Sequence, residues 1–286
     1  MTSGPTPDVR RAIALALATA IVLPVVDAMV KRLVADYPVV MVAWARMGLI
    51  VVFLGIVGGA RLGTRMLQPV AWRLQVLRGL SAVLGTVMVF LGFREMPLAE
   101  CLAIVAIAPV LSNLFSRWWL AEPGDGWSWA MALVSFAGVL VIVRPGTGVW
   151  ATAAVYPVIG AIGLAGFLTI TRAVAGRDDP RVTAFFGPLV SFLAFSTAMP
   201  FNWVTPKTAS HVALFVGIGA LAALAQVLQT LAYRHGTTHQ IAPFSYASVV
   251  VSVFVGWVAF DAMPDGWSTA GIAIIVAAGV GAALRR

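Results

Sequence analysis

Polar side chains inside long apolar stretches are the residues of this sequence that could do chemistry, because a polar group away from water needs a partner. Gln226 and Gln229 are three residues apart, which is the spacing of one helix face. Two amides on that face would need several hydrogen-bond partners, so they are suited to holding a small polar molecule. The candidates for ligand binding are Gln226, Gln229, Tyr246, Ser245, Trp44, Asn113, Ser81 and Arg78.

These candidates also have a purely structural explanation. Small residues four apart, such as Ser252 and Gly256, are typical of helix-packing surfaces. Arg78 lies near the end of its apolar stretch, so its side chain is expected to reach toward the lipid headgroups, with binding of a carboxylate as the alternative. For Gln226 and Gln229 we favour exposure to a cavity over packing, because apolar neighbours could not satisfy both amides.

Charged residues within the apolar stretches form a second group. Asp27 and Arg46 are expected to form a structural ion pair in which each reduces the other's desolvation cost. The alternative is proton coupling, for which the carboxyl groups of Asp27 and Glu100 are the candidates. Glycines and prolines within the stretches are candidate hinges as well as simple kinks. The hinge candidates are Gly85, Pro109, Pro243 and Gly256.

The composition places these residues in a membrane protein. Of the 286 residues, 60% are apolar and only 10% are charged, and the mean hydropathy is +0.95. The net charge of +8 does not indicate nucleic-acid binding, because the basic residues are scattered between apolar runs. The single Cys101 excludes an intramolecular disulfide, and the three histidines lie near the ends of stretches without metal-ligand spacing. We therefore expect no metal, no cofactor and no enzyme.

Turn signals cut the chain into ten apolar segments, each close to the length that crosses a bilayer. The first segment is too long for the core of a cleavable signal peptide. Most Lys and Arg residues fall in the connections on the side of the N-terminus, which predicts that both termini are cytoplasmic. The predicted spans are 11–34, 37–59, 71–93, 96–119, 126–143, 152–173, 180–201, 209–234, 239–260 and 267–284.

A repeated motif divides these spans into two sets of five. "AEPGDGW" at 121–127 precedes the fifth span, and "DAMPDGW" at 261–267 precedes the tenth. Five is an odd number, so a second copy of the unit must cross the membrane in the opposite orientation. The sequence thus predicts an all-α membrane protein of two inverted-topology repeats, residues 1–146 and 147–286, around a central cavity.

The same segments resemble a known family. The "PLAE" run, mid-span Pro109, Glu122, Gly138 and the closing "RPG" stand where the EamA-type drug/metabolite transporter superfamily has them. In the second half, "IAPFSYAS" and "GIAIIVAAG" are similar to the ninth and last helices of that family. Two departures are Asp261, where the family usually has Glu, and Glu100, where an apolar residue is more common. Within the family, the sequence looks most like the YddG-type exporters of aromatic and neutral amino acids.

The resemblance implies a basket-shaped, ten-helix protein of the bacterial plasma membrane. We expect it to export small amphipathic metabolites, with aromatic or neutral amino acids as the leading substrates, by alternating access. Efflux of drugs or other metabolites is the alternative, and a channel or an intramembrane enzyme is more remote. The expected partners are the small-molecule substrate and the lipid bilayer, and a monomer would suffice because the polar faces belong to helices of one chain.

Overall fold

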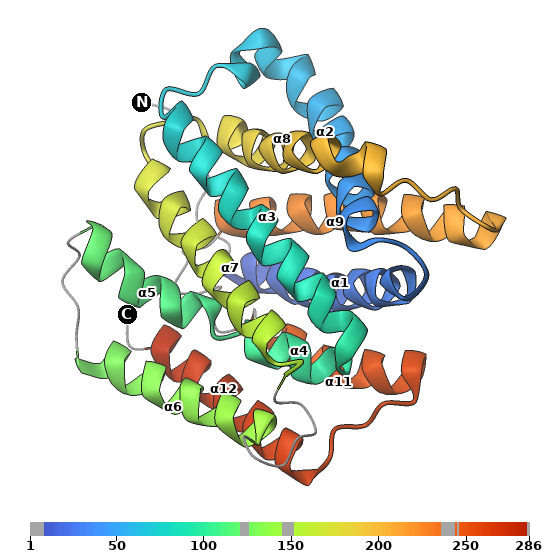
Figure 1. The fold of residues 1–286 in the computed structure, drawn as a ribbon. Helices are drawn as coiled ribbons and strands as arrows, with labels where there is room; N and C mark the ends of the chain where they lie inside the picture. The colour runs from blue at the N-terminus through green and yellow to red at the C-terminus, as the bar shows by residue number, and fades with distance from the viewer. Residues whose placement is uncertain (1–8, 121–125, 145–151, 236–243, 245, 285–286) are drawn as a thin grey trace.

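The computed structural model is all-helical in the residues that it describes, which are 9–120, 126–144, 152–235, 244 and 246–284 (Figure 1). The helices are α1 (Val9–Asp36), α2 (Val39–Leu62), η1 (Gly63–Leu67), α3 (Trp72–Glu95), α4 (Leu98–Val105), α5 (Ala108–Leu120), α6 (Gly126–Val143), α7 (Val155–Val174), α8 (Pro180–Ala198), η2 (Met199–Phe201), α9 (Ala209–His235), α11 (Ala247–Phe260) and α12 (Gly266–Leu284).

The number of apolar spans agrees with the sequence prediction. Seven spans in the described residues are long and apolar enough to cross a membrane, and three shorter apolar helices bring the total to ten. The helices α4 and α5 count as one of the seven, since Leu98–Leu120 is a single apolar stretch. The prediction of an all-α protein with ten apolar helices is therefore confirmed.

The fourth span is broken in its middle, at the predicted hinge residue Pro109. The helix α4 ends at Val105 and α5 begins at Ala108. The break is physically reasonable because proline has no backbone N–H and disfavours helical backbone in the residue before it. The N–H of Ala106 bonds to the carbonyls of Leu102 and Ala103, at 2.9 and 3.2 Å, and the N–H of Ile107 bonds only over three residues, to the carbonyl of Ile104 at 3.2 Å.

Polar residues at the helix ends begin and end the spans. Asp179 is the N-cap of α8 and accepts a hydrogen bond from the N–H of Arg181, with Pro180 at the first helical position. Asp265 accepts a hydrogen bond of 2.8 Å from the N–H of Ser268, so the second repeated motif is a helix start, as predicted. The first copy, at 121–125, lies outside the described residues.

The helices pack mainly on helices from the other part of the sequence. Figure 1 shows α3 running beside α7, α1 beside α9, and α6 beside α12. Each of these pairs joins one of the first five spans to one of the last five. The repeat relates each span to the span five places away along the chain. Under this exchange α3 corresponds to α9 and α7 to α1, so the α3–α7 pair corresponds to the α9–α1 pair. In the same way, α2 corresponds to α8, and the α2–α9 contact corresponds to the α8–α3 contact. The described packing therefore has an approximate two-fold pattern.

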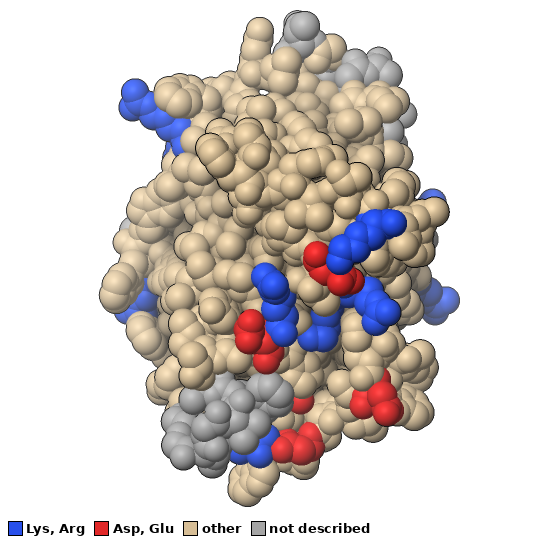
Figure 2. Space-filling model, turned by 45° about the vertical axis from the view of Figure 1, so that its right-hand side comes forward, with Lys and Arg blue, Asp and Glu red and all other residues tan. Residues whose placement is uncertain are grey.

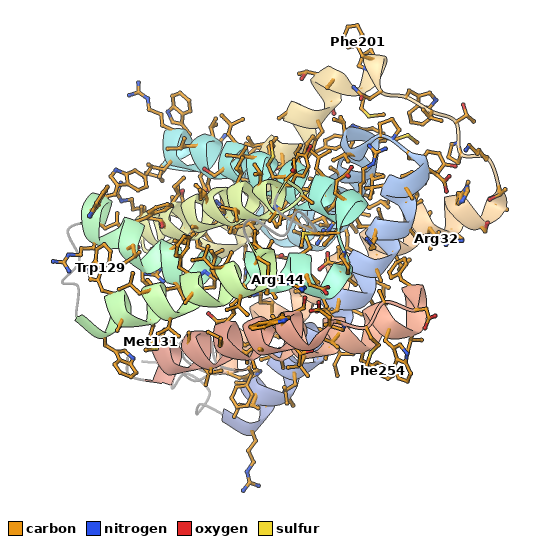
Figure 3. All side chains as sticks on the ribbon, turned by 60° about the horizontal axis from the view of Figure 1, so that its bottom comes forward. Arg32, Trp129, Met131, Arg144, Phe201 and Phe254 are labelled. Carbon is orange, nitrogen blue, oxygen red and sulfur yellow. The ribbon has the colours of Figure 1, made fainter. Side chains whose placement is uncertain are left out.

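The surface is mostly apolar, and charged side chains gather on one face of it (Figure 2). Phe201 and Phe254 are 89% and 61% exposed, and both point away from the bundle (Figure 3). Such side chains would contact lipid rather than water in a bilayer. The face turned forward in Figure 2 instead carries acidic and basic side chains close to one another.

Candidate functional site

Asp27 of α1 and Arg46 of α2 form an ion pair inside the bundle. Arg46 Nη1 lies 3.6 Å from Asp27 Oδ1, which is longer than a charge-assisted hydrogen bond. Asp27 lies about 13 Å along α1 from its end at Asp36, given a rise of 1.5 Å per residue. The expected pair is therefore present, well inside the membrane-spanning part of the chain.

The hydrogen-bonding capacity of this ion pair is only partly used. In the described part of the chain, Arg46 Nε is buried and has no hydrogen-bond partner. The two side chains remain 17% and 16% exposed, so a small molecule or water can reach them. The guanidinium lies over the ring of Phe90 of α3, with 5.7 Å between Cζ and the ring centroid. A buried ion pair of this kind is stabilised only if further hydrogen bonds compensate for its desolvation.

Arg78 belongs to a separate, fully satisfied network. Its side chain is only 3% exposed, and its Nε donates to Gln75 Oε1 at 3.1 Å. Its Nη2 also donates to the carbonyl oxygen of Thr183, and the guanidinium lies over the ring of Phe167. The prediction that Arg78 reaches toward the headgroups is wrong, because hydrophobicity indicated its depth but not the acceptors supplied by α8.

Asn113 and Ser81 lie at contacts of α7 with other helices. Asn113 of α5 accepts a hydrogen bond of 2.8 Å from Arg172 Nη2 of α7. Ser81 of α3 faces Gly163 and Gly166 of α7, where the two helices approach closely. Both predicted binding residues therefore hold helices together in this conformation.

Trp44 and Tyr246 are packed between helices. The indole nitrogen of Trp44 donates to Ser196 Oγ of α8 at 2.9 Å, and the indole stacks on Phe192 with 5.5 Å between centroids. Tyr246 is buried, and its ring packs directly against the backbone of Gly279 in α12. In this conformation the Tyr246 ring is closed to a ligand, and Phe192 covers one face of the half-buried Trp44 indole.

The remaining predicted residues occupy different environments. On α9, Gln226 is half-buried and Gln229 is exposed. Gly85 packs against Leu164 of α7, so its lack of a side chain permits close packing, whereas Gly256 has looser surroundings. Ser245 and Pro243 lie outside the described residues.

Glu100, a predicted coupling residue, lies in a buried polar cluster at the beginning of α4. It is only 3% exposed, and its Oε2 has no hydrogen-bond partner among the described residues. Its electrostatic neighbours include Lys31 of α1 and Asp265. The Lys31 ammonium donates to the carbonyl oxygens of Phe93 and, at 2.8 Å, Met96 at the end of α3.

The connection before α12 is held by Asp265. Its Oδ2 accepts a hydrogen bond of 2.5 Å from Arg144 Nη2 at the end of α6, and Figure 3 shows Arg144 near the place where these helices meet. The pKa of the Asp265 carboxyl is lowered, chiefly by the backbone N–H of Ser268 and with help from Arg144. The carboxylate therefore stays ionised at neutral pH and ties α6 to α12.

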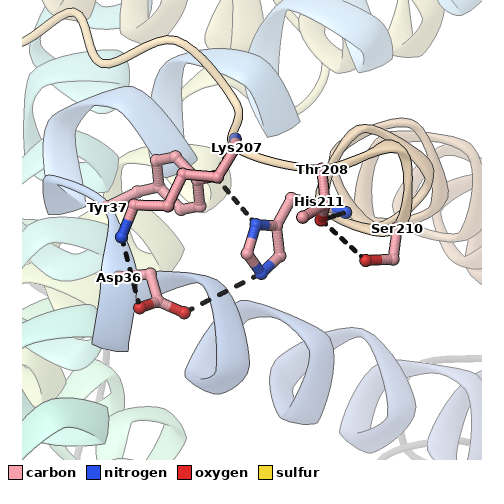
Figure 4. Close-up of polar contacts among 6 residues, drawn as sticks. All are labelled: Asp36, Tyr37, Lys207, Thr208, Ser210 and His211. Atoms are coloured by element: carbon pink, nitrogen blue, oxygen red, sulfur yellow. Dashed lines mark hydrogen bonds and ion pairs between the residues drawn. The ribbon is translucent and has the colours of Figure 1, made fainter.

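Two further polar clusters were not predicted. The Asp36 cluster comprises Asp36, Tyr37, Lys207 and His211, which join the end of α1 to the beginning of α9 (Figure 4). Tyr37 Oη lies 2.9 Å from His211 Nδ1 and accepts a hydrogen bond of 2.8 Å from the Lys207 N–H. Asp36 lies 3.8 Å from His211 Nε2 and 3.9 Å from Lys207 Nζ.

The Asp178 cluster lies at the opposite end of α2 from the Asp36 cluster and comprises Asp178, Gln75, Thr183 and the N-terminus of α3. Asp178 accepts hydrogen bonds of 2.6 Å from the Val70 N–H and 3.0 Å from Gln75 Nε2. Gln75 Nε2 also donates to Thr183 Oγ1 at 2.9 Å. A sequence signal for both clusters exists, because Asp36 begins "DYP" and Asp178 begins "DDP" at the same place in each set of five spans.

Comparison with known proteins agrees with this architecture. The model of the EamA-like transporter family matches residues 10–144. The chain is also similar in fold to a solved crystal structure, with a TM-score of 0.65, 22% identity and coverage of 96% of both chains.

Several transporters are similar to this chain in sequence. The pseudopaline exporter CntI of Pseudomonas aeruginosa is 28% identical over 94% of both chains. A riboflavin transporter of Rhizobium johnstonii is 28% identical over 72% of this chain and 68% of that protein. An S-adenosylmethionine uptake transporter of Rickettsia bellii is 23% identical over 71% of this chain and 69% of that protein.

These similarities confirm the family prediction and leave the narrower resemblance unsupported. The matched family model is one of transporters, and the relatives named above are transporters of riboflavin, pseudopaline and S-adenosylmethionine, as the resemblance implied for the class of protein. The relatives named above do not favour the YddG-type amino-acid exporters over other members of the family.

Proposed function

We propose that this protein is a secondary carrier that exports small amphipathic metabolites across the bacterial plasma membrane by alternating access. Metabolites other than amino acids are the first candidates, because the named relatives transport riboflavin, pseudopaline and S-adenosylmethionine. Export is favoured because the pseudopaline exporter matches over 94% of both chains, a larger share than either of the other two.

The Asp27–Arg46 pair is the observation that carries this proposal. A transporter needs polar groups inside the membrane that are not fully satisfied by the protein. The Arg46 and Asp27 side chains keep 17% and 16% of their surface exposed, and the buried Nε of Arg46 has no hydrogen-bond partner among the described residues. The guanidinium would bind an acidic group of the substrate, Asp27 would bind a basic or hydroxyl group, and Phe90 would contact an aromatic or apolar part.

We further propose that residues 1–146 and 147–286 form the two inverted repeats and that both termini are cytoplasmic. In that orientation the Asp36 cluster is periplasmic and the Asp178 cluster is cytoplasmic. Support comes from the approximate two-fold packing pattern and from the placement of most basic connections on one side. Accessibility of single cysteines introduced at Ala35 and Arg177 to an impermeant thiol reagent would test the orientation.

The main test is flux into and out of proteoliposomes with labelled riboflavin, S-adenosylmethionine, pseudopaline and aromatic amino acids. At least one of these metabolites should cross the membrane of vesicles that contain the protein and should not cross that of protein-free vesicles. If none of them moves, the substrate class is wrong. An imposed pH gradient should change the rate if protons are coupled to transport, and an unchanged rate argues against proton antiport.

Variants connect the flux to the ion pair. Arg46→Gln and Asp27→Asn should each lower the rate by about tenfold or more. A tenfold change corresponds to about 1.4 kcal/mol of free energy. The matched control is Arg32→Gln, which removes an exposed charge of α1. Full rates in both ion-pair variants, at normal expression, would remove the pair from the pathway.

A further inference from the structure

The contacts of α1, α3, α7 and α9 divide the bundle in a way that differs from the two repeats. Most described contacts of α1 are with α9 and α11, and most of those of α7 are with α3 and α5. By contrast, α1 touches α2 and α3, its neighbours in the same repeat, only briefly. We define unit A as α1, α9 and α11, and unit B as α7, α3 and α5.

Close backbone approach holds unit B together. A Cβ atom added to Gly163 of α7 would lie 2.7 Å from the backbone nitrogen of Gly85 in α3. A Cβ atom added to Gly160 would lie 3.2 Å from the nitrogen of Val89, one turn further along the same contact. These helices are in backbone contact over more than one turn, so they cannot slide past each other without separating.

Hydrogen bonds add to the packing of unit B and extend it to α5. Arg172 of α7 donates to Asn113 and Ser116 of α5, at 2.8 and 3.2 Å. Ser112 and Thr169 join the same two helices through their hydroxyl groups at 3.1 Å, and both are buried. Breaking these contacts would leave buried polar groups without partners, which is costly in a membrane.

Each unit is also fastened by one of the two Asp-x-Pro turns. The Asp36 cluster joins the end of α1 to the beginning of α9 within unit A (Figure 4). The Asp178 cluster joins the turn after α7 to the beginning of α3 within unit B. The two clusters occupy equivalent positions of the two-fold pattern and lie at opposite ends of α2.

The contact between the units is different in kind. At the end of α3, the Lys31 ammonium of unit A donates to the carbonyl oxygens of Phe93 and Met96 of unit B. A single long side chain can release two carbonyls more readily than a close backbone contact can separate, although Val30 and Leu33 of α1 also share a buried apolar cluster with Phe93 of α3. Deeper in the bundle, the Asp27–Arg46 pair faces Phe90 of unit B.

We propose that units A and B, each built from helices of both repeats, are the rigid bodies of the transport cycle. The Asp36 and Asp178 clusters stay closed throughout the cycle, and the Lys31 contact breaks when the protein opens on the side where α3 ends. Lys31 is thus a positioning residue that holds the seam between the units shut. This inference rests on the proposed alternating access.

Reversible cross-linking distinguishes this proposal from movement of the two repeats as bodies. In a Cys101→Ala background, cysteine pairs replace Asp36 and His211 within unit A, or Lys31 and Met96 between the units. Each pair is linked with a short bifunctional methanethiosulfonate reagent. The Asp36–His211 link should leave flux within about twofold of the reduced sample, whereas the Lys31–Met96 link should stop flux until dithiothreitol is added.

The outcomes separate clearly. Loss of flux in the Asp36–His211 link would overturn the proposal, because that link joins the two repeats. Unchanged flux in the Lys31–Met96 link would also overturn it. If the Cys101→Ala parent shows no flux while the natural protein does, the test is repeated in a Cys101→Ser background. Absence in both refutes the proposed function instead.

A second measurement does not depend on knowing the substrate. Spin labels at the exposed residues Ala35 and Ser210 report a distance within unit A, and labels at Ala35 and Glu95 report a distance between the units. Lys31→Met keeps the length of the side chain but removes the ammonium. It should lengthen or broaden the Ala35–Glu95 distance by electron paramagnetic resonance and leave the Ala35–Ser210 distance unchanged. The opposite pattern refutes the proposal.

Discussion

Replacing Gly163 by alanine tests the backbone contact between α3 and α7. The added Cβ would lie 2.7 Å from the Gly85 nitrogen and 3.0 Å from its Cα, whereas ordinary contacts are 3.4–4 Å. Because the obstructing atoms belong to the backbone, no side-chain rotation relieves the clash, and the two helices must separate. Overpacking of this kind costs about 1–3 kcal/mol.

Gly166→Ala is the matched control for this change. It lies one turn away on the same helix, and its added Cβ would be 3.4 Å from Ser81 Oγ, an ordinary contact. Both variants gain the same helix propensity, so the difference between them reports packing alone. At about 3 °C per kcal/mol, Gly163→Ala should melt roughly 3–9 °C below Gly166→Ala in detergent. Equal melting temperatures would refute the close α3–α7 contact.

Three further predictions concern stability. Removing one partner of the buried pair, by Asp27→Asn or Arg46→Gln, should destabilise the protein more than the double change does, because a lone buried charge is costly; thermal melting of the three variants in detergent checks this. The pKa of Asp265 is lowered on folding, so its contribution is complete above the unfolded value of about 3.9 and is lost as the pH falls through the folded value. The melting-temperature advantage of the natural protein over Asp265→Asn should therefore be full at pH 6 and shrink below about pH 4, and a constant difference would contradict the assignment. Trp44→Phe should cost about 1 kcal/mol by breaking the hydrogen bond to Ser196, and Ser196→Ala combined with it should cost little more, as melting of the single and double variants would show.

The sequence predicted the spans well because their signals are local. Long apolar stretches between polar turns identify ten helices without knowledge of their neighbours, and Pro109 indicated where the fourth span breaks. Arg78 shows the limit of such signals. Its position near the end of a span suggested a headgroup contact. Gln75 is a neighbour of Arg78 on the same helix, but the carbonyl of Thr183 comes from α8, which only the fold brings to it.

The candidate site was predicted less completely than the fold. The Asp27–Arg46 pair was found because two opposite charges in adjacent apolar spans need each other. Trp44, Asn113 and Ser81 were chosen by residue type and spacing, which cannot distinguish a helix contact from a cavity wall. Lys31 was not among the predicted site residues, because its carbonyl partners at the end of α3 are distant in the chain.

The pair formed by α6 and α12 explains why units A and B can move while the bundle stays together. These helices begin at the glycines of the two copies of the repeated motif, Gly126 and Gly266, and pack chiefly on each other. A Cβ atom added to Gly271 would lie 2.8 Å from the carbonyl oxygen of Gly138. A Cβ atom added to Gly138 would lie 3.1 Å from the carbonyl oxygen of Gly271. The contact is reciprocal, and the Arg144–Asp265 bond closes it at one end. Since neither helix depends on unit A or unit B for its main contacts, the pair can remain fixed in the membrane while the seam between the units opens.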